Sequence, residues 1–432
     1  MKQFGHVSRL AVGLLIAALG LAYAQDDPKL RIKIIRDLSK GGSSSIEKIE
    51  AYLTDPVPDV RIEAVKAIVD IGTQRSLDPL VKATADSEPE VQIRATDGLV
   101  NFYLPGYART GFGASFRKIG TSIKGKFTDT NDQVIDSYIQ VRPDVIAALG
   151  KLARGGATMD ARANAARAVG ILRGREAIPD LEQALRSKDS RVIYESLIAL
   201  QKIRDRSAGP SVAFLMRDLD EKVQVTAIET TGLLGNKDAL NTLRDLLDRS
   251  KKMAVKRAAL TAMAQMPDPE LHGVYLARLA DKDEGLREAA AEGIGRLKDP
   301  GDLQRVESAF AAEKKTEPRL SMSFALVALG KHGMADLDPL RYLVNNLNSA
   351  AYRGVARAYL IELARDPAVR TALYPVLQET EATKDEKTGL AQVFASSGAN
   401  DSIGPLETLS KDPNGDVASE ALRALKSIRA VQ

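Results

Sequence analysis

The chain has 432 residues, of which 61 are lysine or arginine and 57 are aspartate or glutamate, so its formal net charge is only +4. Such a small excess gives no support for binding DNA or RNA, which requires a basic face, and we expect no nucleic-acid partner. The absence of cysteine excludes disulfides and a lipid-modified N-terminal cysteine.

The first 24 residues have the three parts of a secretory signal peptide. Lys2 and Arg9 give a positive start, residues 10–21 are apolar or glycine, and Ala22 and Ala24 occupy the positions that a signal peptidase reads. An apolar run of about a dozen residues is too short to span a hydrocarbon core of roughly 30 Å. We therefore expect cleavage after Ala24 and a periplasmic location, with secretion beyond the cell as the second choice.

A pattern of small residues recurs about every 31 residues from Val60 onward. In each copy, residues four, seven and eleven positions after an apolar residue are small or apolar, as at Ala64, Ala67 and Ile71. Spacings of three and four mark one face of a helix, on which small side chains let neighbouring helices approach closely. A fixed period of this size predicts a solenoid. Further copies start at Val91, Ala161, Val192, Val223, Val255, Leu286 and Val417.

Each copy is predicted to hold a second, amphipathic helix, often opened by proline, as at Pro79 and Pro179. The fold class is therefore all-α: a solenoid of antiparallel helix pairs that forms one domain over residues 25–432. Residues 28–53 resemble one further pair. Residues 317–398 follow the period less cleanly, so we expect longer or bent helices there.

The run Asp59-Val60-Arg61, with Ala64, Ala67 and Ile71-Gly72, resembles a HEAT-type repeat, and more narrowly the short bacterial HEAT-like repeats named after phycobilin lyases. The resemblance covers roughly residues 28–430. It implies the solenoid fold and leaves function open, since the family hosts scaffolds, adaptors and a few enzymes. It also implies an arginine ladder whose members pair with aspartates or helix ends between repeats, with anion binding as the alternative: Arg61, Arg94, Arg162 and Arg287.

One segment breaks the period. The step from Val91 to Ala161 is 70 residues, more than twice the usual one. The expected second helix of this repeat begins at Arg142-Pro143, so residues 103–141 are inserted in the turn between the two helices. Insertions in solenoids emerge on one face, which is often the binding face.

The insertion is rich in glycine, aromatic and basic residues, with no acidic residue between Pro105 and Lys126. Alternation over residues 112–116 and 119–123 would suit two short strands, and irregular structure fits equally well. The aromatic residues either cover the neighbouring repeats, bind a partner or touch an anionic membrane surface. The candidate partner-binding residues are Tyr103, Tyr107, Arg109, Phe112, Phe116, Arg117, Lys118, Lys124, Lys126 and Phe127.

No pattern typical of catalysis was found. His272 and His332 are each followed by glycine, so the His-Glu pairs that hold iron in deoxyhypusine hydroxylase, a HEAT-like enzyme, do not occur. The Gly-x-Ser-x-Gly pattern of serine nucleophiles is absent, and no ligands are spaced for zinc. We therefore expect a protein that is not an enzyme and has no cofactor or metal.

The function that the sequence favours is an exported scaffold or adaptor, which binds a protein or peptide partner through the solenoid groove and the inserted loop. The groove is expected to be lined by the second helices, with candidate contacts at Arg244, Tyr275, Arg278, Arg341 and Tyr342. The alternatives are an envelope-associated protein whose loop touches anionic lipid or cell-wall polymer, and an enzyme with an unrecognised site. The sequence leaves the partner's identity and the oligomeric state open.

Overall fold

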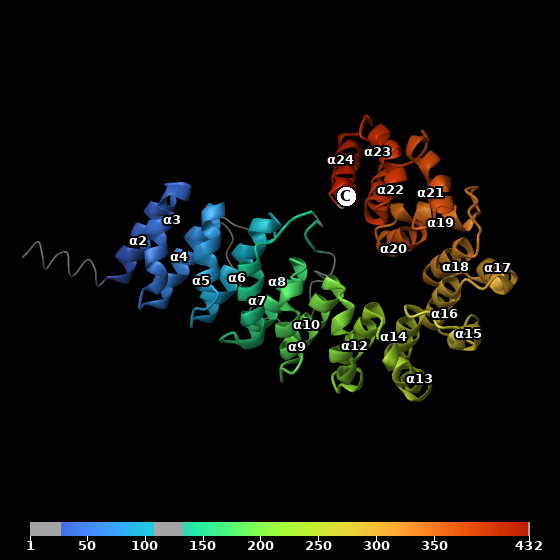
Figure 1. The fold of residues 1–432 in the computed structure, drawn as a ribbon, viewed down its shortest axis with the longest axis horizontal. Coiled ribbons are helices and arrows are strands. Elements are labelled where there is room, and N and C mark those ends of the chain that lie inside the picture. The colour runs from blue at the N-terminus through green and yellow to red at the C-terminus, as the bar shows by residue number, and fades with distance from the viewer. Residues whose placement is uncertain (1–26, 108–132, 137, 431–432) are drawn as a thin grey trace, which may run out of the picture. The chain divides into compact units, whose positions relative to one another are not determined.

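The computed structural model describes residues 27–107, 133–136 and 138–430, and these residues form helices and connections without a β-strand (Figure 1). The predicted all-α solenoid is confirmed. Residues 1–24, with the expected signal peptide, lie outside the described part. None of the described helices is long and apolar enough to cross a membrane.

The described residues fall into two compact units. Unit 1 comprises Met1–Ile135 and Val141–Ile203, and unit 2 comprises Asp136–Gln140 and Arg204–Gln432. A short piece at the end of the insertion therefore belongs to unit 2, although the helices on both sides of it belong to unit 1. The prediction of a single solenoid domain over 25–432 stays a prediction.

The helices that carry the small residues, called first helices below, form one row in each unit. In unit 1 they are α2 (Pro28–Ser39), α4 (Pro58–Ile71), α6 (Pro89–Tyr103), α8 (Met159–Ile171) and α10 (Ser190–Ile203). In unit 2 they are α12 (Glu221–Leu234), α14 (Met253–Ala264), α16 (Glu284–Leu297), α18 (Thr316–Ala328), α20 (Arg353–Leu363), α22 (Lys384–Ser397) and α24 (Gly415–Arg429).

The second helices are shorter, and many begin or end in a 3₁₀ turn. In unit 1 they are α3 (Ile46–Glu50) with η1 (Gly42–Ser45) and η2 (Ala51–Thr54), α5 (Leu77–Ala83) with η3 (Gln74–Ser76), α7 (Pro143–Gly155), and α9 (Ile178–Ala184) with η4 (Arg175–Ala177). In unit 2 they are α11 (Gly209–Val212) with η5 (Arg206–Ala208) and η6 (Ala213–Arg217), α13 (Leu240–Arg249) with η7 (Lys237–Ala239), α15 (His272–Leu276) with η8 (Pro269–Leu271), α17 (Leu303–Ala312) with η9 (Pro300–Asp302), α19 (Pro339–Asn345) with η10 (Asn346–Asn348), α21 (Pro367–Leu373) with η11 (Tyr374–Gln378), and α23 (Ile403–Leu409) with η12 (Asn400–Ser402).

Local sequence fixes the ends of the first helices. At the start of α12, the Asp220 carboxylate accepts hydrogen bonds from the backbone N–H groups of Lys222 and Val223, which satisfies donors that the helix leaves unpaired. The same helix ends at Gly235, whose φ of 69° is left-handed and suits glycine. Capping of this kind turns the chain sharply into the second helix.

Small residues let the first helices pack backbone to backbone. A Cβ built on Gly232 of α12 would lie 2.5 Å from the Cα of Ala262 on α14, and one on Gly170 of α8 would lie 2.7 Å from the Cα of Ala199 on α10. Neither distance is compatible with a real Cβ, so both positions require glycine. The prediction that small side chains allow close helix approach is confirmed in both units.

Close packing along one row decides which row lies on the inside of a curve. In unit 2, Figure 1 shows the first helices α12 to α24 along the inner side of the curved row and the second helices along its outer side. The expectation that second helices line the groove was wrong. The side with tightly packed helices is shorter, and the first helices are the ones with the small residues.

Two further expectations concern irregular regions. The second helix expected after the insertion is present as α7. The longer helices expected over residues 317–398 are not found, since α18 to α22 have ordinary lengths, and the alternative of bent helices stays a prediction. The period is disturbed there by the connection between α18 and α19, which runs from Leu329 to Asp338.

Candidate binding surface

A polar cluster joins three first helices of unit 1. Asn164 of α8 donates a hydrogen bond of 2.9 Å to the Asp97 carboxylate on α6. Arg167 of α8 donates two, of 2.6 and 3.1 Å, to the Glu195 carboxylate on α10. The Glu195 side chain is 6% exposed and that of Arg167 is 31% exposed, so the cluster reaches from the helix row to the surface.

Residues on both sides of the undescribed part of the insertion are held by the helices α8 and α10. At its start, the Tyr107 hydroxyl is hydrogen-bonded to Arg167 of α8. At its end, Lys202 of α10 donates a 3.2 Å hydrogen bond to the backbone oxygen of Gln133, and the backbone N–H of Ile135 donates one of 3.0 Å to the backbone oxygen at the end of α8. Tyr107, Gln133 and Ile135 therefore lie on the first-helix side of unit 1, next to the polar cluster.

Burial changes the acidity of this cluster. Desolvation raises the pKa of Asp97 to about 6, while its hydrogen bond from Asn164 and the nearby Arg167 charge act in the opposite direction. Desolvation, together with the Asp97 charge, raises the pKa of Tyr107 to about 12. Asp97 is thus a carboxyl group that can change its charge close to neutral pH.

Raised carboxyl pKa values mark the first-helix face in both units. Desolvation is the largest cause of the raised pKa at Asp70 on α4, Asp97 on α6, Glu229 on α12 and Glu288 on α16. For Glu288 the pKa reaches about 7, with further contributions from the Glu292 and Glu317 charges. Protein surrounds these side chains on several sides, as expected for groups in a row of closely packed helices.

Unit 2 contains a second polar cluster, which is more deeply buried. The Tyr359 hydroxyl of α20 donates a hydrogen bond to Glu292 of α16 and lies 2.7 Å from the Ser321 hydroxyl of α18. Arg296 pairs with Glu292 at 2.7 Å and with Glu362 at 3.0 Å. The Phe324 ring stacks on Tyr359 with a centroid distance of 4.9 Å. These contacts tie three first helices together and leave little of the cluster exposed.

The ladder arginines pair as expected at three positions. Arg61 donates to Asp86 at 2.8 and 2.9 Å, and Arg287 donates to Glu313 at 2.6 and 3.1 Å, in each case across a repeat boundary. Arg162 donates to the backbone oxygen of Ala153 near the end of α7. Arg94 differs, since its ion pair is with Glu90 of its own helix. Arg61, Arg162 and Arg287 therefore hold neighbouring repeats together.

Of the predicted insertion residues, the structure describes two. Tyr103 ends α6, and its hydroxyl accepts a 3.2 Å hydrogen bond from the backbone N–H of Arg142. Tyr107 lies in the polar cluster. The others lie outside the described residues: Arg109, Phe112, Phe116, Arg117, Lys118, Lys124, Lys126 and Phe127.

Three of the candidate contacts on second helices are buried or engaged in ion pairs. Tyr275 is fully buried, with its ring against Gly293 of α16. Arg278 and Arg341 have ion pairs with Asp248 and Glu379. The polar cluster of unit 1 was missed, because its side chains come from helices 28 to 67 residues apart and no local pattern joins them.

One group of metal-ligand type was also missed. Donor atoms of His272, Asp299 and Asp302 lie within 4.8 Å of one another. His272 is hydrogen-bonded to Asp302 at 2.7 Å, and Asp299 accepts from the backbone N–H of Gly301 at the start of η9. These hydrogen bonds account for the arrangement, and we assign no metal to it.

Family comparisons agree with this architecture. A model of HEAT repeats matches residues 16–100 and 210–271, and a model of the PBS lyase HEAT-like repeat matches residues 161–187. The matched residues thus carry helical repeats of the HEAT type. More narrowly, the chain contains a PBS lyase HEAT-like repeat beside its HEAT repeats.

One relative is similar to part of the chain in sequence. The chain is 30% identical over 181 residues to "Phycocyanobilin lyase subunit alpha" of Nostoc sp. (strain PCC 7120), an alignment that covers 39% of this chain and 62% of the relative. This chain therefore matches less than two thirds of that relative's length. The relative is named as an enzyme component, so the expectation that this protein is not an enzyme is contradicted. That expectation rested on the absence of local motifs.

Solved structures resemble the chain in fold alone. The complex of CpcE and CpcF of phycocyanin lyase from Nostoc sp. is 19% identical, with a TM-score of 0.32, and the match covers 69% of this chain and 92% of that chain. Importin beta is 12% identical, with a TM-score of 0.36, and the match covers 100% and 66%. We draw no functional argument from either.

Proposed function

We propose that this protein is a repeat subunit that binds a protein partner on the first-helix face of unit 1, beside the two ends of the insertion. The observation that carries the proposal is the anchoring of both ends. Tyr107, Gln133 and Ile135 are all held by α8 or α10, so whatever the insertion contacts is brought to that face. Solenoids commonly bind partners on such extended surfaces.

The chemistry of the face suits a specific partner. Asp97, Arg167 and Tyr107 offer a carboxylate, a guanidinium and a phenol within one cluster, and arginine and tyrosine are enriched at binding hot spots. The homologous lyase subunit supports a role as one component of a larger assembly, since its name describes a subunit. The proposed role is that of an exported scaffold, and the exported location rests on residues 1–24 alone.

A second candidate function is lyase chemistry of the kind named for the relative. It is favoured by Asp97, whose raised pKa of about 6 suits a general acid or base near neutral pH. In this case the tetrapyrrole in the relative's name, phycocyanobilin, would be the first compound to test.

The experiment compares two variants that each remove one negative charge. Asp97→Asn changes the cluster while keeping an acceptor for Asn164, and Glu176→Gln changes an exposed carboxylate of η4 on the other helix row. Wild type and both variants serve as bait in a crosslinked pull-down from the envelope fraction of the source cells, and each is mixed with phycocyanobilin and followed by visible absorption. A fourth bait replaces residues 108–132 by a short Gly-Ser linker.

Partner binding at the cluster predicts that one defined protein is recovered with wild type and Glu176→Gln, and about fivefold to tenfold less with Asp97→Asn and the linker variant. Equal recovery with all four baits would contradict it. An absorption change that requires Asp97 and no protein partner would instead favour the second candidate. Circular dichroism melts show whether each bait is folded.

A further inference from the structure

A pocket lies on the second-helix row of unit 2, between two successive repeats. The segment formed by α11 and η6 touches the segment formed by η7 and α13 at both ends. At one end the Asn236 side chain donates a 3.2 Å hydrogen bond to the backbone oxygen of Gly209, and at the other end Arg217 lies 3.5 Å from Asp245. Between these contacts the segments separate and leave a pocket of about 400 Å³.

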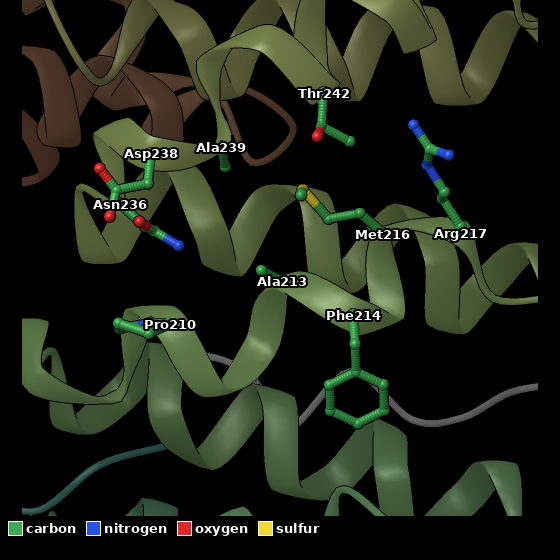
Figure 2. A pocket seen from close by; sticks show the side chains of 9 residues that line it. All are labelled: Pro210, Ala213, Phe214, Met216, Arg217, Asn236, Asp238, Ala239 and Thr242. Atoms are coloured by element: carbon green, nitrogen blue, oxygen red, sulfur yellow. The ribbon is translucent and has the colours of Figure 1, made fainter.

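Small residues on both sides account for the space. Pro210 and Ala213 line the pocket from one segment, and Ala239 and Thr242 line it from the other (Figure 2). Met216 also lines the pocket and is 2% exposed, which gives it an apolar, polarisable wall. Large side chains at the small positions would have closed the gap between the repeats.

The pocket has an exposed aromatic side chain and two opposite charges at its edge. Phe214 lines it and is 54% exposed. Figure 2 shows Asp238 and Arg217 on opposite sides of the pocket, with Met216 and Ala213 between them. Both charged side chains belong to exposed residues. The 3.5 Å contact between Arg217 and Asp245 is long for an ion pair, so the guanidinium can turn to another carboxylate at little cost.

We propose that this pocket binds an extended segment of a protein partner, which inserts one large apolar side chain between a basic residue facing Asp238 and an acidic residue facing Arg217. The site lies on the second-helix row, so it does not depend on the proposed function of the first-helix face. Its occupant would cover Phe214 and pack against Met216.

Three features favour a peptide segment. The volume is near the lower end of the range of about 300–1,000 Å³ that ligand pockets span, which suits one or two side chains. Phenylalanine, methionine and arginine are the residue types enriched in the cores of protein interfaces. The pocket has opposite charges on its two sides. They are complementary to a segment that carries a basic residue on one side of its apolar residue and an acidic residue on the other.

The test uses three blocked pentapeptides as probes: acetyl-Lys-Ala-Phe-Ala-Glu-amide, and the corresponding peptides with lysine at both ends or glutamate at both ends. Binding is followed in the full mature chain by the ¹³C-methyl NMR signal of Met216, which the Met216→Leu variant assigns. The expected result is a shift of this signal that saturates at the lowest concentration with the mixed-charge peptide.

Variants then separate the proposed contacts. Phe214→Ala should weaken the mixed peptide about tenfold, as expected for an aromatic anchor. Leu422→Ala, which truncates a 57% exposed leucine of α24, is the matched control and should leave binding unchanged. Asp238→Lys should shift the preference to the glutamate peptide, and Arg217→Glu to the lysine peptide, each by about threefold, as expected for exposed charges.

The proposal fails if no peptide moves the Met216 signal. It also fails if Phe214→Ala and Leu422→Ala behave alike, or if the charge variants leave the order of the three peptides unchanged. All substituted residues in this set except Met216 are exposed, and unchanged melting temperatures would show that the variants fold. A partner protein found at the first-helix face would have no bearing on these outcomes.

Discussion

The polar clusters of unit 1 and unit 2 are each built on first helices, yet the cluster of unit 1 is partly exposed and that of unit 2 is buried. In unit 1, the Arg167 side chain is 31% exposed, and the partner that joins it from outside the helix row is Tyr107 of the insertion. In unit 2, the Arg296 side chain is 14% exposed and lies over the Phe324 ring at 5.2 Å. The repeat pattern places charged side chains on the first-helix face. The neighbouring aromatic residues determine whether these charged side chains are buried or exposed.

This difference explains why only the unit 1 cluster is a candidate site. The Tyr359 hydroxyl is hydrogen-bonded to Glu292 and Ser321, and all three side chains belong to first helices. Such a network stabilises the packing of α16, α18 and α20 and offers few groups to a partner. The groups around Asp97 and Arg167 perform a similar structural task, while the Arg167 side chain remains 31% exposed.

The largest expected effect tests what the two units share, which is backbone contact between first helices. Gly232→Ala and Gly170→Ala should each lower the free energy of unfolding by about 3 kcal/mol, because the new Cβ meets a Cα atom that cannot move aside. Gly354→Ala, at a helix position with nothing within 4 Å, is the control and should be neutral or slightly stabilising. Urea denaturation followed by circular dichroism measures all three. A small loss in free energy of unfolding for only one of the two glycine variants would show that the first helices do not pack equally closely in both units.

The next effect separates the buried cluster from the partly exposed one. Tyr359→Phe should cost about 2 kcal/mol, because buried Glu292 loses a hydrogen-bond donor. Tyr107→Phe should cost less than about 1 kcal/mol, because the partly exposed Arg167 keeps Glu195 and can bind water. The same denaturation experiment gives both values. Equal losses would mean that the unit 1 cluster is as much a part of the core as that of unit 2.

The smallest expected effect concerns pH. Unfolded Glu and Asp have pKa values of about 4.3 and 3.9, whereas the folded values are about 7 for Glu288 and about 6 for Asp97. The folded state therefore retains protons that the unfolded state has lost, so these groups make stability fall as pH rises from about 4 towards 7. Glu288→Gln should remove this loss and gain about 1 kcal/mol over wild type at pH 8, after allowance for solvent screening.

Carboxyl ¹³C NMR titration provides the direct measurement for both groups. Asp97 should titrate near pH 6 and Glu288 near pH 7. An ordinary value near 4 for Asp97 would remove the physical basis of the second candidate function. It would leave the partner-binding proposal intact, since a charged Asp97 can still bind a basic group.

Much of the fold could be predicted because its determinants are local. The small residues after Val60 and its counterparts predict the first helices, and the proline of Arg142-Pro143 predicts where the repeat resumes after the insertion. Which row faces inward was predicted wrongly, since it depends on how closely helices approach across repeats, as at Gly232 and Ala262. The clusters escaped prediction for the same reason: Tyr359 and Glu292 are 67 residues apart.

One contact in unit 2 differs from the rest in its reach along the chain. Arg423 of α24 donates to Asp136, 287 residues earlier, and Lys426 lies 4.3 Å from the centre of the Tyr138 ring. Contacts between neighbouring repeats close loops of roughly one period and can form as the chain is synthesised, whereas this one must wait for the last helix. The docking of Asp136 and Tyr138 is therefore a late step of folding, and it reports whether α24 has folded.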